Sequence, residues 1–121
     1  MAYDNNNIFA KILREEIPCK KIYEDDFVLS FYDINPQKKI HALVIPKGKY
    51  IDLDDFAINA SVDEIVGLIK GINIVAKKLN ISVDIGKGYR ALANISEHGG
   101  QEVPHLHFHL FGGESIGKMV Q

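Results

Sequence analysis

Three of the five histidines in the chain occupy alternate positions near its carboxyl end, in the run His105-Leu106-His107-Phe108-His109. This alternation of polar and apolar residues has the period of a β-strand, on which successive side chains point to opposite faces. We therefore expect the three imidazoles on one face of a strand and the apolar side chains on the other. A polar, titratable face of this kind indicates chemistry more than packing.

The spacing allows two kinds of chemistry. Side chains at i and i+4 of a strand are roughly 13 Å apart at their roots, so one metal ion can gather two of the histidines but hardly all three. A metal site would need a further ligand, for which His41 or Glu102 is available. A phosphate group explains the row more economically, because a neutral imidazole can attack phosphorus while its other nitrogen donates to a backbone carbonyl. In that interpretation His107 is the nucleophile, His109 donates to a phosphate oxygen, and His105 orients the pocket.

A short glycine-rich loop, Gly99-Gly100-Gln101, comes just before the histidine row. Glycine lets the backbone approach a ligand closely, and backbone N–H groups in such loops bind phosphate. A plain loop hinge would use the same residues, so the loop supports the phosphate interpretation without deciding it. We predict no bound metal and no other cofactor.

The rest of the chain predicts the elements that must position these residues. A short helix capped by Asn7 comes first, and a long helix begins after Ser61, whose spacing to Glu64 is a capping-box pattern. Short turns between the first three strands favour antiparallel pairing. We expect an α+β fold in which a five-stranded antiparallel sheet carries one long and one short helix on one face, while loops or a second subunit cover the other. The predicted strands cover 21–23, 27–32, 41–45, 89–94 and 105–111, and the apolar face of the long helix comprises Ile65, Leu68, Ile69, Ile72, Val75, Ala76 and Leu79.

Composition excludes several classes of protein. A length of 121 residues suits a single domain, 1–121, with one sizeable core. The net charge of −2 gives no general attraction to nucleic acid or to an anionic membrane. Apolar runs fall far short of the roughly 20 residues that span a bilayer, and the first residues lack the apolar stretch of a signal peptide. Because Cys19 is the only cysteine, a disulfide within the chain is impossible. We expect a cytoplasmic protein.

The run 105–111 resembles the His-x-His-x-His signature of the histidine-triad (HIT) family. Other segments are similar to the Hint branch of that family, and they occur along this chain in the same order as in that branch. These segments are 8–12 with 16–18, 23–26, 31–37, 41–47, 88–90, 94 and 99–101. The resemblance implies a homodimer in which two sheets join into one ten-stranded sheet. It also implies a hydrolase that cleaves the P–N bond of AMP or GMP phosphoramidates through a nucleotidyl-histidine intermediate on His107.

The resemblance assigns roles to individual residues. Asp33 matches the acid that binds both ribose hydroxyls, and a carboxylate can accept two hydrogen bonds. His41 and His105 match a supporting pair behind the nucleophile. The other predicted nucleotide-binding residues are Phe9, Phe31 and Ile34 at the base, and Asn94, Gly100, Gln101, Glu102, His107 and His109 around the phosphate.

Two alternative functions stay open. The other branch of the family hydrolyses dinucleoside polyphosphates with the same triad, although the segments around Asp33 and Asn94 favour the Hint branch. A purine-nucleotide-binding regulatory protein with little turnover is the second alternative, and the intact triad argues against it. The tail 114–121 lacks the aromatic and proline residues of animal members, so the leaving group also stays open.

Overall fold

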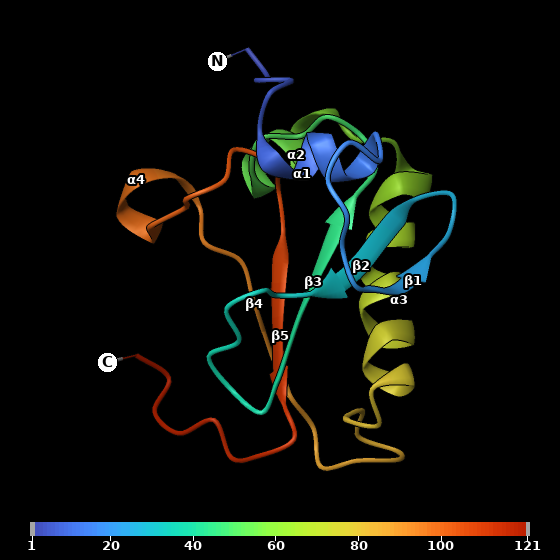
Figure 1. Ribbon diagram of the computed structural model, residues 1–121, viewed down its shortest axis with the longest axis vertical. Coiled ribbons are helices and arrows are strands. Elements are labelled where there is room, and N and C mark those ends of the chain that lie inside the picture. Colours follow the sequence, from blue (N-terminus) through green and yellow to red (C-terminus); the bar gives the residue numbers. More distant parts are fainter. Residues whose placement is uncertain (1, 121) are drawn as a thin grey trace.

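The computed structural model describes residues 2–120 of the chain. Figure 1 shows the long helix α3 running along one side of the sheet, with α1 and α2 near one end of the strands. The elements follow in the order α1 (Ile8–Leu13), β1 (Lys21–Glu24), β2 (Val28–Tyr32), β3 (Ile40–Pro46), α2 (Leu53–Asn59), α3 (Val62–Lys78), β4 (Arg90–Leu92), α4 (Ser96–Gly99) and β5 (Phe108–Gly112).

The five strands form one sheet in the order β1-β2-β3-β5-β4, and every neighbouring pair is antiparallel. This confirms the predicted α+β fold with a five-stranded antiparallel sheet. The last strand returns between β3 and β4, so that Leu43 is opposite His109 and His41 is opposite Phe111. Segments nearly 70 positions apart in the chain are thereby brought side by side at the sheet centre.

The last two strands are shorter than predicted. β4 covers Arg90–Leu92 rather than 89–94, and β5 begins at Phe108 rather than at residue 105. Residues 105–107 leave the ladder, because the N–H of Leu106 donates to the carbonyl of Tyr50, 2.8 Å away. The predicted division of faces nevertheless holds, since Leu106 and Leu110 are buried in the core beneath α3.

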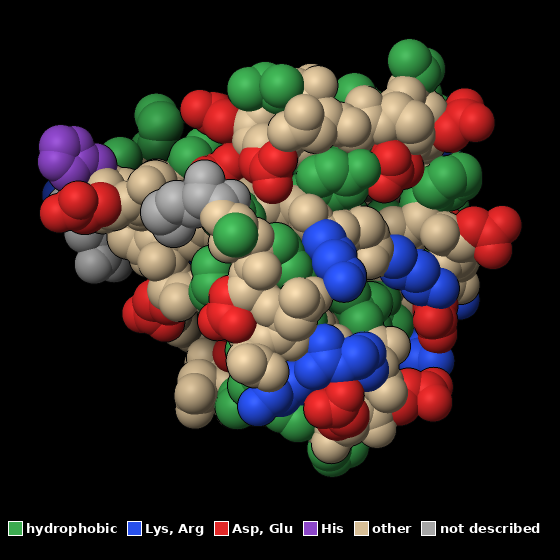
Figure 2. All heavy atoms as spheres, turned by 90° about the horizontal axis from the view of Figure 1, so that it is seen from above, with side chains coloured by type: hydrophobic (Ala, Val, Ile, Leu, Met, Phe, Trp, Pro, Cys, Tyr) green, Lys and Arg blue, Asp and Glu red, His purple; other side chains and the backbone are tan. Residues whose placement is uncertain are grey.

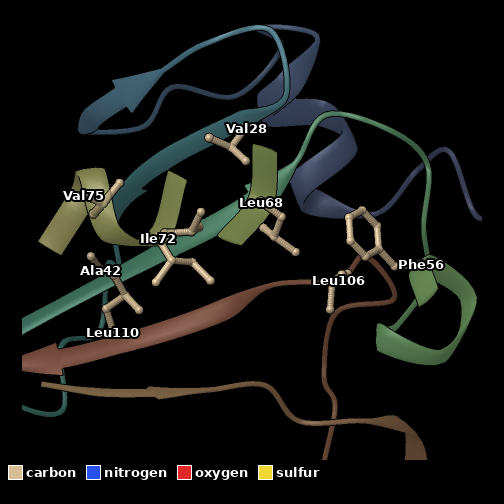
Figure 3. Close-up of a cluster of buried hydrophobic side chains, with 9 residues drawn as sticks. Val28, Ala42, Phe56, Leu68, Ile72, Val75, Leu106 and Leu110 are labelled. Atoms are coloured by element: carbon tan, nitrogen blue, oxygen red, sulfur yellow. The ribbon is translucent and has the colours of Figure 1, made fainter. Parts of the chain in front are cut away.

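Helix α3 begins as predicted. The Ser61 hydroxyl accepts from the N–H of Glu64, and the Glu64 carboxylate accepts from the N–H of Ser61, which completes a capping box. Gly71 lets the helix lie close to the sheet, because a Cβ there would come within 2.8 Å of a Val28 methyl. Ile69, predicted on the apolar face, is instead 61% exposed. Figure 3 shows the side chains that meet between α3, the sheet and α2: Val28, Ala42, Phe56, Leu68, Ile72, Val75, Leu106 and Leu110.

The prediction that both helices pack on one face is wrong. Helix α1, whose first turn is capped by Asn7 as predicted, lies on the face opposite α3. Its side chains Phe9 and Ile12 pack on Leu29, Phe31, Leu43 and Ile45 of the sheet. Helices α2 and α4 were not predicted, because two turns or fewer are too short to show a helical period.

The mixture of charged side chains on the surface is consistent with the small net charge of the chain. Figure 2 shows acidic, basic and apolar side chains intermixed on the face seen from above, with Lys and Arg gathered toward one side. Within residues 2–120, no helix combines the length and the apolar character needed to cross a membrane.

Candidate active site

A cavity of about 170 Å³ opens on the α1 face of the sheet, between α1, the β2–β3 connection and the loop that precedes β5. It brings together seven of the predicted site residues from six separate segments. The residues that line it are Phe9, Asp33, Gln37, Leu43, Asn94, Gly100, Glu102, Val103, His107 and His109. Gly100 ends α4 with φ 73°, in the left-handed region that favours glycine.

His107 presents a bare ring nitrogen to this cavity. Its Nδ1 lies 2.7 Å from the carbonyl oxygen of His105. A carbonyl can only accept, so Nδ1 carries the proton and Nε2 keeps a free lone pair. Burial lowers the pKa of His107, an effect that the His105 carbonyl and the charges of Asp33 and Glu102 partly oppose. The Phe9 ring also packs against the imidazole in a T-shaped arrangement, with the two ring centroids 4.9 Å apart.

His41 and His109 form a pair whose tautomers can also be assigned. The backbone N–H of Gln37 donates to Nδ1 of His41 at 3.2 Å, so this nitrogen is an acceptor. The proton of His41 is therefore on Nε2 and is donated to Nδ1 of His109, 2.9 Å away. His109 then carries its own proton on Nε2. Burial, with smaller contributions from His107 and His41, lowers the pKa of His109 to about 4, so it donates as a neutral ring.

His105 is fully buried and does not line the cavity. Its Nε2 lies 2.8 Å from the carbonyl oxygen of Pro46 and therefore donates, which leaves Nδ1 to accept from the Tyr3 hydroxyl at 2.6 Å. Burial lowers the pKa of His105 to about 4. Its contact with the site is made by its backbone carbonyl, which holds His107.

Asp33, His41 and His109 are close enough to raise the question of a metal ion, since one potential ligand atom from each lies within 4.8 Å of the others. The hydrogen bonds oppose this. An ion at Nε2 of His41 would have to displace its proton, and the other nitrogen already accepts from the Gln37 N–H. The arrangement is therefore better explained as a hydrogen-bonded pair of imidazoles beside a carboxylate.

Several predicted site residues lie outside the cavity. The Gln101 side chain accepts from the N–H of Ser96 and donates to the carbonyls of Ile51 and Val103, so it braces the loop. Phe31 lies behind the site, where its ring packs against Phe9 in a T-shaped arrangement.

Ile34, a predicted base-pocket residue, is 85% exposed and does not contribute to the cavity. Sequence reasoning missed Tyr3 and the backbone of Gln37. Neither gave a signal, because one is a single aromatic residue in a polar segment and the other acts through its main chain.

Comparisons with known proteins identify the family of the chain. Residues 14–116 match the HIT domain, and the chain belongs to the HIT domain family. The predicted resemblance is thus confirmed.

Two curated relatives and one solved structure illustrate the similarity. The chain is 51% identical over 118 residues to an uncharacterised 13.2 kDa HIT-like protein of Azospirillum brasilense, covering 98% of this chain and 94% of that one. It is 40% identical over 114 residues to the purine nucleoside phosphoramidase of Escherichia coli, covering 93% and 92%. The structure of a HIT family hydrolase from Clostridium thermocellum superimposes with a TM-score of 0.86 at 35% identity, covering 98% and 99%.

Proposed function

We propose that this protein hydrolyses the P–N bond of AMP and GMP phosphoramidates, with His107 as nucleophile. The observation that carries the proposal is the hydrogen bond from Nδ1 of His107 to the His105 carbonyl, because it leaves Nε2 neutral and unprotonated at the cavity. Family membership and the similarity to a purine nucleoside phosphoramidase support the substrate class.

The first step forms one bond and breaks another. Nε2 of His107 attacks the α-phosphorus, and the bond from phosphorus to the amine breaks. The amine takes up a proton as it leaves. We assign the donor role to Glu102 in its carboxylic acid form, because Glu102 lines the cavity. The nucleotidyl-imidazole carries a positive charge, and its Nδ1–H stays bonded to the His105 carbonyl. Water then gives hydroxide to phosphorus and its proton to Glu102, which releases the nucleotide and restores the neutral ring.

The remaining cavity residues bind the nucleotide in this proposal. His109 donates its Nε2–H to a phosphate oxygen, with Asn94 and the backbone at Gly100 lining the same cavity. Asp33 accepts from the ribose hydroxyls. Phe9 borders the base. These roles keep all charged substrate atoms next to donors and the ribose next to an acceptor.

A homodimer belongs to the same proposal. β4 is an edge strand of the sheet, so its outer hydrogen-bonding groups are available to a second copy. Val62, Val66 and Ile69 form an exposed apolar strip on one face of α3, 75%, 43% and 61% exposed. Burying such a strip against another chain would be favourable.

The test is the identity of the residue that becomes nucleotidylated. Rapid mixing with an AMP phosphoramidate followed by mass spectrometry should place AMP on His107. His107→Ala should lose on the order of 10⁴-fold or more in kcat/KM while AMP still binds. His98→Ala is the matched control, because His98 is an exposed histidine outside the cavity.

Three outcomes would contradict the proposal in different ways. Near-normal turnover by His107→Ala would refute the assignment of the nucleophile. Faster hydrolysis of a dinucleoside polyphosphate than of any phosphoramidate would place the chain in the other branch of the family. Tight AMP binding without turnover of either substrate would identify a nucleotide-binding regulatory protein.

A further inference from the structure

Asp33 is fixed between the proposed ribose position and the His41–His109 pair. One carboxylate oxygen accepts from the backbone N–H of Asn35 at 2.8 Å. The other lies 3.5 Å from Nε2 of His41. The backbone N–H of Asp33 also donates to the carbonyl of His41 at 3.1 Å, so main chain and side chain are both held against this histidine. Binding ribose alone would not require a carboxylate oriented in this way.

The His41–His109 pair can share polarisation between its two neutral rings through the hydrogen bond that joins them. The proton on Nε2 of His41 lies in a 2.9 Å hydrogen bond to Nδ1 of His109. In the proposed complex, the far nitrogen of His109 donates to the phosphate. As negative charge grows on a phosphate oxygen, both N–H groups are polarised and partial positive charge develops on the two rings, without the uptake of a proton. His41 is 2% exposed, and a buried positive charge is costly unless a counter-charge lies beside it.

The groups around the pair differ in their effect on such a charge. Phe111 stacks on His109 and carries no charge, and the His107 ring lies 5.1 Å from the His109 ring. The cationic side chains Lys38, Arg90 and Lys118 line a neighbouring cavity that also contacts His109, and they oppose a positive charge. Glu102 lines the proposed active site, and Asp33 is the carboxylate that pairs with His41.

On the basis of the proposed function, we propose that Asp33 has a second role beside binding ribose: it is the counter-ion that stabilises the partial positive charge induced on the His41–His109 pair while His109 donates to a phosphate oxygen, with no proton added to the pair. Electrostatics support this reading. Burial lowers the pKa of both His41 and His109, and the charge of Asp33 raises both. One carboxylate would thus link recognition of the sugar to stabilisation of the phosphate.

The first experiment needs neither substrate nor activity. The imidazoles of ¹⁵N-histidine-labelled protein are titrated by NMR in wild type, in Asp33→Asn and in the control Asp26→Asn, whose carboxylate is exposed. Asparagine keeps an acceptor for the Asn35 N–H but removes the charge. An adjacent opposite charge shifts a pKa by roughly 1–3 units, so the pair in Asp33→Asn should titrate at least about one unit lower than in wild type, or not at all before acid unfolding. Equal midpoints in wild type and Asp33→Asn would overturn the proposal.

The second experiment separates the two roles of Asp33 by removing the ribose hydroxyls. Wild type and Asp33→Asn are compared on an AMP phosphoramidate and on its 2′,3′-dideoxy analogue. A carboxylate that served only the hydroxyls would make no difference on the dideoxy substrate. The counter-ion role predicts a remaining loss in kcat of roughly tenfold or more, equivalent to one pKa unit. Asp33→Glu, which keeps the charge, should recover part of that kcat, and equal kcat values for wild type and Asp33→Asn on the dideoxy substrate would refute the role.

The two experiments distinguish failure of this inference from failure of the proposed function. If wild type does not hydrolyse phosphoramidates, the proposed function fails, yet the NMR titration still decides whether Asp33 is the counter-ion. If wild type is active and the titration midpoints are equal, only the inference fails.

Discussion

His105 is buried as a neutral ring, and acid should therefore destabilise the protein partly through this one side chain. The ring has no exposed surface, and burial holds its pKa at about 4, against 6.5 for a free histidine. The folded pKa is the lower one, so the unfolded chain binds more protons between these two values. The resulting stability is present above about pH 6.5 and is lost as the pH falls toward 4. From the two pKa values, the contribution lost between pH 7 and pH 5 is roughly 2 kcal/mol in the free energy of unfolding.

Urea unfolding of wild type and His105→Gln at both pH values measures this contribution. A glutamine amide can still donate to the Pro46 carbonyl, but it does not titrate. Wild type should therefore lose about 2 kcal/mol more than the variant between pH 7 and pH 5. His98→Gln, a change at an exposed histidine, should keep the wild-type pH dependence. Equal losses in wild type and His105→Gln would refute the reasoning, because the neutral burial of His105 would then not be the source.

Two further predictions concern the framework that holds the site. Leu110→Ala removes a fully buried side chain between the sheet and α3 and should cost about 2–5 kcal/mol in urea unfolding; a loss below about 1 kcal/mol would mean that the core closes around the gap. Ser61→Ala removes one half of the capping box at the start of α3 and should cost about 1 kcal/mol, whereas an unchanged midpoint would show that the Glu64 half suffices.

Structural features that depend on residues close together in the sequence could be predicted. The capping box at Ser61 needs only residues three positions apart, and it forms as predicted. Alternation along the histidine row correctly separated Leu106 and Leu110 from the imidazoles. Asn7 likewise marked the start of α1. In each case the interaction that forms the structure joins residues close together in the chain, so the sequence pattern is enough to predict it.

Contacts between distant segments could not be predicted in the same way. The pairing of His41 with His109 depends on β5 entering the sheet beside β3, which no local pattern specifies. The Tyr3 hydroxyl reaches His105 across 102 positions of the chain. Gln37 acts through a backbone N–H, which is the same for every residue but proline. Ile34 was assigned to the base pocket by resemblance, and on the single chain it is exposed.

Strand β5 begins at Phe108 rather than at residue 105 as predicted, and this difference bears on the proposed chemistry of His107. In a regular ladder the carbonyl of each residue points sideways toward a neighbouring strand and is used there. Had β5 begun at residue 105, the carbonyl of His105 would have been committed to the sheet. Because the chain leaves the ladder over 105–107, that carbonyl instead accepts from Nδ1 of His107, and the proton is held on the side away from the cavity. The irregular segment is thus what leaves Nε2 of the central histidine neutral and free, as the proposed mechanism requires. Replacing it with regular strand should therefore remove the proposed activity while keeping all three imidazoles.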